Sequence, residues 1–214
     1  LYVAIADVTG SGTSAALITA AARAVFSRLE NEDLSLIEMM RAWDHAIASC
    51  SQNEVFMTGL LLRLNTQTGE GAFVNAAHNP PYVMRENTDG SFSPEFLLSG
   101  VSSRLGEGST GRFSEKQFQL GPNEAVILYT DGLFSIERAG GRPLGERRFG
   151  LRLATRAEFA RSAKHLTEAA LRTFNEHRSN LPIPDDVTIV SIRRAGPERK
   201  TFLENDCGAL YVSN

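Results

Sequence analysis

The chain has 214 residues, of which 42% are hydrophobic and 22% are charged, and its net charge is −3 at pH 7. This composition is typical of a globular protein with a sizeable core, and the length suits one domain of ordinary to large size. The charge gives no basis for a nucleic-acid-binding surface, which needs a clustered excess of Lys and Arg, and it also argues against a polybasic membrane anchor.

The cysteines and the apolar runs bear on where the protein works. Cys50 and Cys207 match neither a disulfide framework nor a zinc site, and free thiols are typical of a reducing compartment, so we expect a cytoplasmic protein. No apolar run approaches the roughly 18 residues of a transmembrane helix, and no signal peptide is visible. Leu1 opens an apolar run without a preceding Met, so we expect a fragment of a longer protein.

The first fifty residues predict one strand and two helices. The apolar residues 1–6 predict a core strand, which is followed by a glycine-containing turn over residues 7–12. Residues 15–30 are rich in Ala and Leu without Gly or Pro, and they predict a helix. The S-x-x-E pattern of residues 35–38 is a capping box, which opens a second helix that runs to about Ser49. The apolar face of this helix carries Ile37, Met40, Trp43 and Ile47.

The rest of the chain is dominated by strands. Residues 55–64 and 72–76 predict a hairpin around the turn at residues 65–69. Further strands are predicted over residues 82–85, 113–120, 125–129 and 187–193, with a helix over residues 157–178. Because the helices are grouped apart from hairpin-linked strands, we expect an α+β fold. We expect one domain over residues 1–194 and a linker or docking segment over residues 195–214.

Three places join an apolar strand to aspartate: Asp7, Asp131 and the pair Asp185–Asp186. Carboxylates that are held rigidly at strand ends repel one another if they converge, unless a cation lies between them. Mg²⁺ and Mn²⁺ prefer such oxygen ligands. Each aspartate alone is also an ordinary turn or cap residue, so spacing leaves both interpretations open.

Five motifs in order resemble the PPM-type serine/threonine phosphatases, in particular the bacterial branch named after the stage II sporulation protein E phosphatase. The family patterns are DVSGKG…AAL, F-x-T…LD-x-x-TG, NAGHNPP, YTDG and DDITLV. The matching segments here are residues 5–17, 56–69, 75–81, 129–132 and 185–190. Together they cover roughly residues 3–193.

The resemblance implies a sandwich of two antiparallel sheets with helices on the outer faces, and two Mn²⁺ or Mg²⁺ ions at one edge. Asp7 would bridge both ions, the carbonyl of Val8 would add a ligand, and Asp131 and Asp185 would complete the shell of one ion. Gly132 and Asp186 are candidate supporting residues. No side chain is assigned as nucleophile, because a water activated by the metal ions attacks phosphorus.

His78 is a further candidate supporting residue with two interpretations. It is a general acid for the leaving serine oxygen, or it is a turn anchor beside Pro80 and Pro81 that bonds to the backbone. The family motif implies a structural role, which we favour.

The implied substrate is phosphoserine or phosphothreonine on a protein, in this branch often an anti-sigma-factor antagonist in a partner-switching pathway. An upstream sensory or receiver domain is expected in the full-length protein.

Three departures from the family keep open a second hypothesis, a pseudophosphatase that binds a signalling partner. The family's GGD-x-x-D segment would precede Leu1, Ala77 replaces the usual Gly, and Ser135 stands in place of an acidic residue, with Glu137 displaced. A calcium-binding structural domain is disfavoured, because the sequence has no loop of the D-x-[DN]-x-[DN]-G type.

Overall fold

The structure is a computed structural model. It describes residues 1–29, 32–51, 54–100, 102–107, 112–134, 144–156, 162–178, 181–183, 185–196 and 208–212. Cys207, Ser135, Glu137 and residues 157–161 of the predicted C-terminal helix lie outside these ranges. Cys50 is an exposed thiol. Among the described residues, no helix combines the length and the apolar character needed to cross a membrane.

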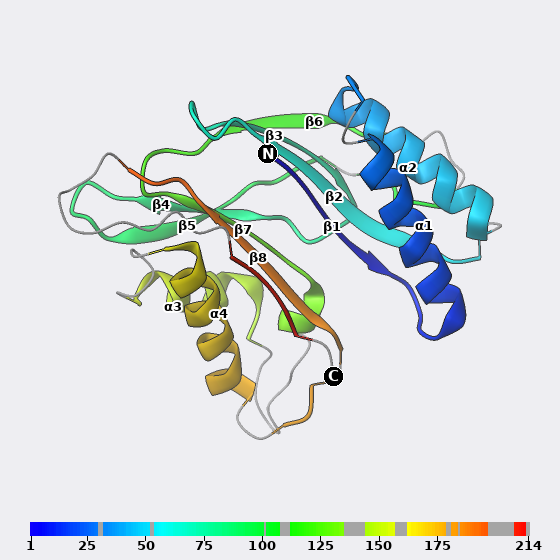
Figure 1. The fold of residues 1–214 in the computed structure, drawn as a ribbon. Helices are drawn as coiled ribbons and strands as arrows, with labels where there is room; N and C mark the ends of the chain where they lie inside the picture. The colour runs from blue at the N-terminus through cyan, green and yellow to red at the C-terminus, as the bar shows by residue number, and fades with distance from the viewer. Residues whose placement is uncertain are drawn as a thin grey trace. The chain divides into compact units, whose positions relative to one another are not determined.

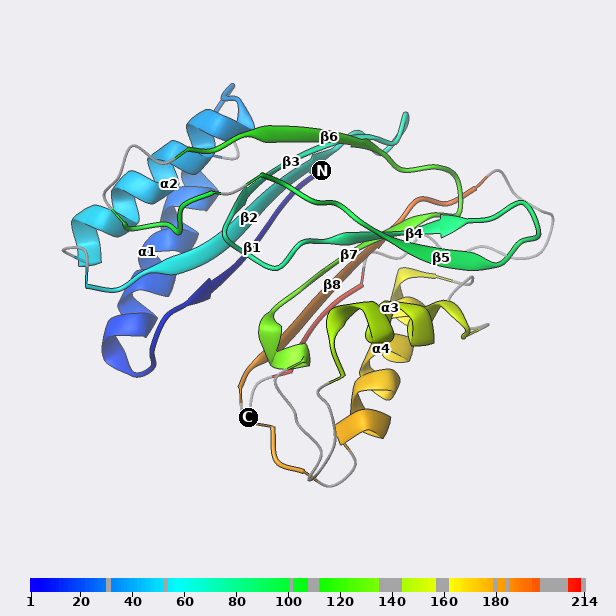
Figure 2. The ribbon, with the colours of Figure 1, turned by 180° about the vertical axis from the view of Figure 1, so that it is seen from behind.

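Contacts within the chain divide it into two compact units. One consists of Leu1–Pro80 and Leu98–Gln119, and the other of Pro81–Leu97 and Leu120–Asn214. In the described residues, each unit contains an antiparallel sheet and two α-helices. Figures 1 and 2 show these elements as ribbons. The predicted α+β class with two antiparallel sheets is therefore confirmed.

The first unit is built on a four-stranded sheet. Its order is β1 (Tyr2–Val8), β2 (Met57–Leu64), β3 (Glu70–Ala76) and β6 (Glu115–Gln119). The predicted hairpin is confirmed as β2 and β3, and Asn65 shapes its turn. The Asn65 side-chain oxygen accepts hydrogen bonds from the backbone N–H groups of Gln67 and Thr68, at 3.0 and 3.2 Å.

Helices α1 (Thr13–Leu29) and α2 (Leu36–Ser51) lie along one face of this sheet (Figures 1 and 2). The predicted capping box at the start of α2 is present, and the predicted apolar face is buried apart from Ile37, which is half-buried. Trp43 joins the two helices, because its indole N–H donates to the Ala22 carbonyl at 3.0 Å. The core of the unit therefore lies between the helices and the sheet.

The second unit contains a five-stranded sheet. Its order is β5 (Phe92–Phe96), β4 (Tyr82–Glu86), β7 (Ala125–Tyr129), β8 (Val187–Arg193) and β9 (Gly208–Val212). Helices α3 (Glu146–Ala154) and α4 (Ala163–Arg178) belong to this unit, and a 3₁₀ turn, η1 (Asp131–Leu133), follows β7. All five residues of β7 are buried, and Ala125, Ile127 and Tyr129 pack in a core shared with α3 and α4.

Among the described elements of the second unit, β5, η1, α3 and β9 were not predicted. In addition, α4 begins at Ala163, whereas the predicted helix began at residue 157. Strand β9 lies in the predicted linker or docking segment and pairs with β8. The boundary after residue 194 stays a prediction.

Candidate metal centre

Asp7 is positioned by strand pairing in the first unit. The predicted strand stopped at residue 6, but pairing of Val8 with Met57 continues the ladder, so Asp7 lies inside β1, opposite Thr58. Thr9 fixes the end of this ladder, because its N–H and its hydroxyl both donate to the Phe56 carbonyl, at 2.8 and 2.9 Å. Asp7 is half-buried, so its carboxylate belongs to a structured strand end rather than to a loose turn.

The turn between Asp7 and α1 depends on glycine. Gly10 and Gly12 have φ angles of +90° and +82°, in the left-handed region that glycine enters without steric cost. The helix then begins at Thr13, and Ala16 donates its N–H to the Gly12 carbonyl at 3.1 Å. This geometry explains the two glycines of the predicted turn.

Asp131 and Asp185 lie at one end of the second sheet. Strands β7 and β8 are antiparallel neighbours, so the last residue of β7 and the first of β8 meet there. Thr130 ties the two ends together: its N–H donates to the Thr188 carbonyl at 3.1 Å, and its hydroxyl donates to the Asp186 carbonyl at 3.1 Å. Asp131 and Asp185 are both exposed.

Gly132 is required where η1 meets the start of β8. A Cβ atom on Gly132 would lie 2.2 Å from the Asp186 carbonyl oxygen and 3.2 Å from the Asp185 carbonyl oxygen. No side chain fits in that space without moving backbone. The close approach of the two segments, and with it the placement of Asp131, therefore depends on a glycine at this position.

His78 lies in the turn after β3 and is 6% exposed. Its backbone is held by the amide of Asn75, which accepts from the His78 N–H at 2.7 Å and donates to the His78 carbonyl at 2.9 Å. Its ring nitrogen Nδ1 lies 2.9 Å from the Thr58 hydroxyl. These contacts are those of a turn residue that also reaches the strand beside Asp7.

The chemistry of these residues fits a hard divalent cation. Carboxylate oxygens are the ligands that Mg²⁺ and Mn²⁺ prefer, and exposed carboxylates leave room for the waters these ions retain. The predicted ligands are divided, with Asp7 and Val8 in the first unit and Asp131 and Asp185 in the second. In the described part of the chain, no three His, Cys, Asp or Glu side chains lie close enough together to hold an ion.

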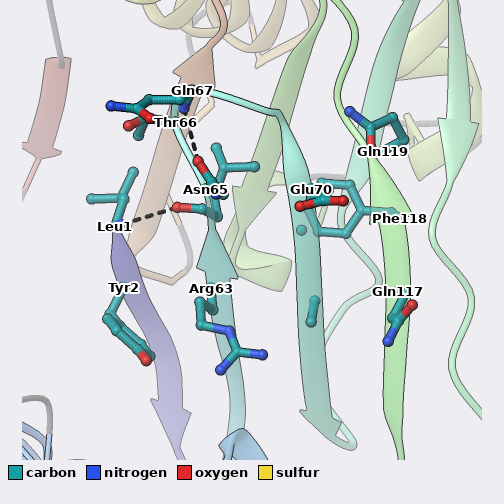
Figure 3. A pocket seen from close by; sticks show the side chains of 13 residues that line it. Leu1, Tyr2, Arg63, Asn65, Thr66, Gln67, Glu70, Gln117, Phe118 and Gln119 are labelled. Carbon is teal, nitrogen blue, oxygen red and sulfur yellow. Dashed lines mark hydrogen bonds between the residues drawn. The ribbon is translucent and has the colours of Figure 1, made fainter.

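A pocket of about 970 Å³ lies elsewhere in the first unit (Figure 3). Its lining includes Leu1 and Tyr2 at the start of β1, together with Arg63, Glu70 and Gln117. Asp7 lies near the other end of β1, and none of the predicted ligands lines the pocket. We therefore do not assign this pocket to the candidate metal centre.

Two residues that lie beside the candidate ligands were not assigned a role from the sequence. They are Thr58, opposite Asp7, and Thr130, between the ends of β7 and β8. Both stand inside motifs that resemble the phosphatase patterns, the first in F-x-T and the second in YTDG. The signal was therefore present, but only the pairing of the strands shows what these hydroxyl groups contact.

Comparison with known sequences agrees with the motifs. The sequence pattern of the family described as Stage II sporulation protein E (SpoIIE) matches residues 1–195. The phosphoserine phosphatase RsbP of Bacillus subtilis (strain 168) is 28% identical over 133 residues, which are 60% of this chain and 32% of RsbP. The chain thus spans about a third of the length of that relative.

Comparison of folds gives the same result. The PP2C domain of SiaA from Pseudomonas aeruginosa has a TM-score of 0.73 and 26% identity, over 90% of this chain and 75% of the SiaA chain. The catalytic domain of the phosphatase PstP, in complex with 2 manganese ions, has a TM-score of 0.58 and 18% identity, over 92% and 88% of the two chains. Because the family match extends over residues 1–195, the chain belongs to the Stage II sporulation protein E family, a branch of the PPM-type phosphatases.

Proposed function

We propose that this chain is the catalytic domain of a protein phosphatase that hydrolyses phosphoserine or phosphothreonine with the help of two Mn²⁺ or Mg²⁺ ions. The family match over residues 1–195 carries the proposal. The relative RsbP is named as a phosphoserine phosphatase, and PstP, which shares the fold, has been solved with 2 manganese ions. Both facts support the proposal.

In this proposal each strand end has a defined task. Asp7, Asp131 and Asp185 hold the ions, and the carbonyl of Val8 adds a backbone ligand. When bound, two such ions activate a water and neutralise the phosphoryl oxygens. Thr130 keeps the ends of β7 and β8 together, which limits the freedom of the carboxylates at that end. Gly132 keeps the backbone of η1 close to Asp185 and Asp186.

The test is turnover in the full-length protein as Mn²⁺ is titrated, with a phosphoserine peptide and a generic aryl phosphate as substrates. We expect activity that depends on Mn²⁺ and that Asp131→Asn reduces by at least about 100-fold, because the variant removes a ligand charge. Asp33→Asn, which changes an exposed carboxylate in the loop before α2, should keep full activity. Turnover that is indifferent to Mn²⁺ or to Asp131→Asn would refute the proposal.

The second candidate function is a pseudophosphatase that binds a signalling partner without turnover. Its support is the set of departures from the family. Among these, Ala77 lies in the described part of the chain, and this residue adopts φ of +55° despite having a Cβ atom. The turn therefore forms with alanine, which weakens that part of the argument. Absent turnover in the full-length protein, together with retained binding of a phosphoprotein, would favour this function.

The partners follow from the same resemblance. We propose a phosphorylated anti-sigma-factor antagonist as substrate and an upstream sensory or receiver domain as the source of control, in the cytoplasm. RsbP, of which this chain matches 32%, supports the phosphoserine chemistry by its name. Dephosphorylation of a purified antagonist protein, followed by mass spectrometry, tests the substrate directly.

A further inference from the structure

The turn that carries His78 is held in a costly conformation. Ala77 has φ of +55°, in the left-handed region, which costs a residue with a Cβ atom roughly 1–2 kcal/mol. Two sets of contacts hold it there: the Ala77 N–H donates to the Ser102 hydroxyl at 2.9 Å, and the Asn75 amide makes two hydrogen bonds to the backbone of His78. Strain that is held so firmly is often found beside a functional group.

This turn determines the position of the His78 ring. The ring is buried, and its Nδ1 lies 2.9 Å from the Thr58 hydroxyl. Thr58 stands directly opposite Asp7 in the ladder of β1 and β2, so the two side chains share one face of the sheet as nearest cross-strand neighbours. The imidazole therefore contacts the residue beside the proposed bridging ligand.

The Thr58 hydroxyl makes two contacts. It lies 3.5 Å from the Asp7 backbone carbonyl, a long contact in which the hydroxyl is the donor. It also lies 2.9 Å from the His78 Nδ1, where the donor is set by the tautomer of the ring. The two contacts hold the rotamer of Thr58 against the strand that bears the Asp7 carboxylate.

We propose that Thr58 and His78 are positioning residues for Asp7, which hold its carboxylate in the direction that metal binding needs. The inference rests on the proposed function, in which Asp7 would help to hold the ions. The turn itself is closed by Asn75 and Ser102, so the contact between the His78 ring and Thr58 is not needed to form it. A role in orienting Asp7 explains why the ring is aimed there.

The same geometry argues against His78 as a general acid. A general acid must reach the leaving oxygen directly or through one water. The ring is 6% exposed, and its Nδ1 is engaged with Thr58. Residues that orient a ligand typically change metal affinity by 10–100-fold when they are removed, without touching substrate.

The test measures Mn²⁺ affinity by isothermal titration calorimetry in the full-length protein, which reports on the site without turnover. Thr58→Val keeps the shape of the side chain but removes the hydroxyl, and we expect Mn²⁺ to bind about 10-fold more weakly or worse. Thr58→Ser retains the hydroxyl and should restore the affinity. The matched control is Thr19→Val, because the Thr19 hydroxyl bonds within α1 to the Ala15 carbonyl.

A second pair of variants separates a loss of Mn²⁺ binding from a loss of folding. His78→Asn keeps an amide that can donate or accept close to the place of Nδ1 and should retain most of the affinity, whereas His78→Leu should lose it to the extent that Thr58→Val does. The stability of each variant is measured by denaturant unfolding. If both residues only support the fold, Thr58→Val and His78→Leu lower stability while the folded variants bind Mn²⁺ as the parent does, which would overturn the inference.

The outcome also separates this inference from the proposed function. If the parent protein binds no Mn²⁺, the proposed function fails and this inference fails with it. If the parent binds Mn²⁺ and Asp7→Asn abolishes binding, the proposed ligand stands. Unchanged affinity in Thr58→Val would then overturn the positioning role alone.

Discussion

The close approach of η1 to the start of β8 in the second unit requires glycine at position 132. In Gly132→Ala the new Cβ would lie 2.2 Å from the Asp186 carbonyl oxygen, so backbone must move. Overpacking of this kind typically costs about 1–3 kcal/mol of unfolding free energy. We expect that loss in a guanidinium titration followed by circular dichroism.

The control for that prediction is Gly100→Ala, because no heavy atom lies within 4 Å of a Cβ built there. It should change the unfolding free energy by no more than about 0.5 kcal/mol. Equal losses in the two variants would mean that the close approach of η1 to β8 is not what Gly132 supplies.

Ala77 gives the opposite prediction at the residue scale. Ala77→Gly removes the strain of a positive φ, worth roughly 1–2 kcal/mol, but adds chain entropy to the unfolded state, worth roughly 0.5–1 kcal/mol. Because the side chain is exposed, little packing is lost. We expect a net stabilisation of up to about 1.5 kcal/mol in thermal or denaturant unfolding, and a measured loss would contradict this account of the turn.

At the scale of elements, the capping box of α2 makes part of the stability depend on pH. Hydrogen bonds from the hydroxyl and then the N–H of Ser35 hold the pKa of Glu38 below its ordinary value of 4.5. A carboxyl group whose pKa is lower in the folded state stabilises the protein above its unfolded pKa. That contribution is lost as the pH falls through the folded pKa.

The variant that tests this is Glu38→Gln, which cannot titrate. We expect the difference in unfolding free energy between the parent and Glu38→Gln to be larger at neutral pH than at an acidic pH below the lowered pKa of Glu38, where the carboxyl group is protonated. Glu54→Gln, which changes another exposed carboxylate, should not reproduce this narrowing. A difference that is independent of pH would show that the ionised carboxylate is not what caps the helix.

The elements that the sequence predicted depend on local residue patterns, whereas the elements that it missed depend on contacts between distant segments. The first two helices and the β2–β3 hairpin follow from local pattern, capping and turn chemistry, and they are confirmed. Pro94 and Gly150 argue against regular structure locally, yet they lie in β5 and α3. A Cβ on Gly150 would lie 3.0 Å from the Pro94 Cβ, so the two residues meet where α3 packs on β5. Tertiary packing offsets their poor propensities there.

The candidate site shows the same division. The position of Asp131 and Asp185 at strand ends could be predicted from the sequence, because strand period and turn residues are local signals. The place of Thr58 beside Asp7 could not be predicted, because it depends on which residues pair across β1 and β2. Strand β9 is a further case, since its pairing with β8 joins the predicted tail to a strand that precedes it.

At the scale of the whole molecule, the proposed ligands come from both units, which gives a prediction about stability. A ligand that binds only the folded protein at about 100 times its Kd adds roughly 2.7 kcal/mol. For a chain of this size that corresponds to a rise in Tm of about 5–10 °C. We expect Mn²⁺ to raise Tm in differential scanning fluorimetry and EDTA to reverse the rise.

Asp7→Asn and Asp131→Asn should each abolish the rise in Tm, although the two residues belong to different units. Asp33→Asn should retain it. If Mn²⁺ still stabilises Asp7→Asn as strongly as the parent, the ions are held by the second unit alone, and the assignment of Asp7 as a bridging ligand is wrong.

The two units are interleaved along the chain, and this affects how the protein is made. The first unit is completed only by Leu98–Gln119, after Pro81–Leu97 of the second unit has already been synthesised. During synthesis, β4 and β5 therefore leave the ribosome before β6, which completes the first sheet. Strand β4 gains its second neighbour only after β7 has been synthesised. Neither unit can be produced as one continuous segment of the chain. A nascent chain that stops before residue 120 contains an incomplete sheet, whose exposed edge favours aggregation.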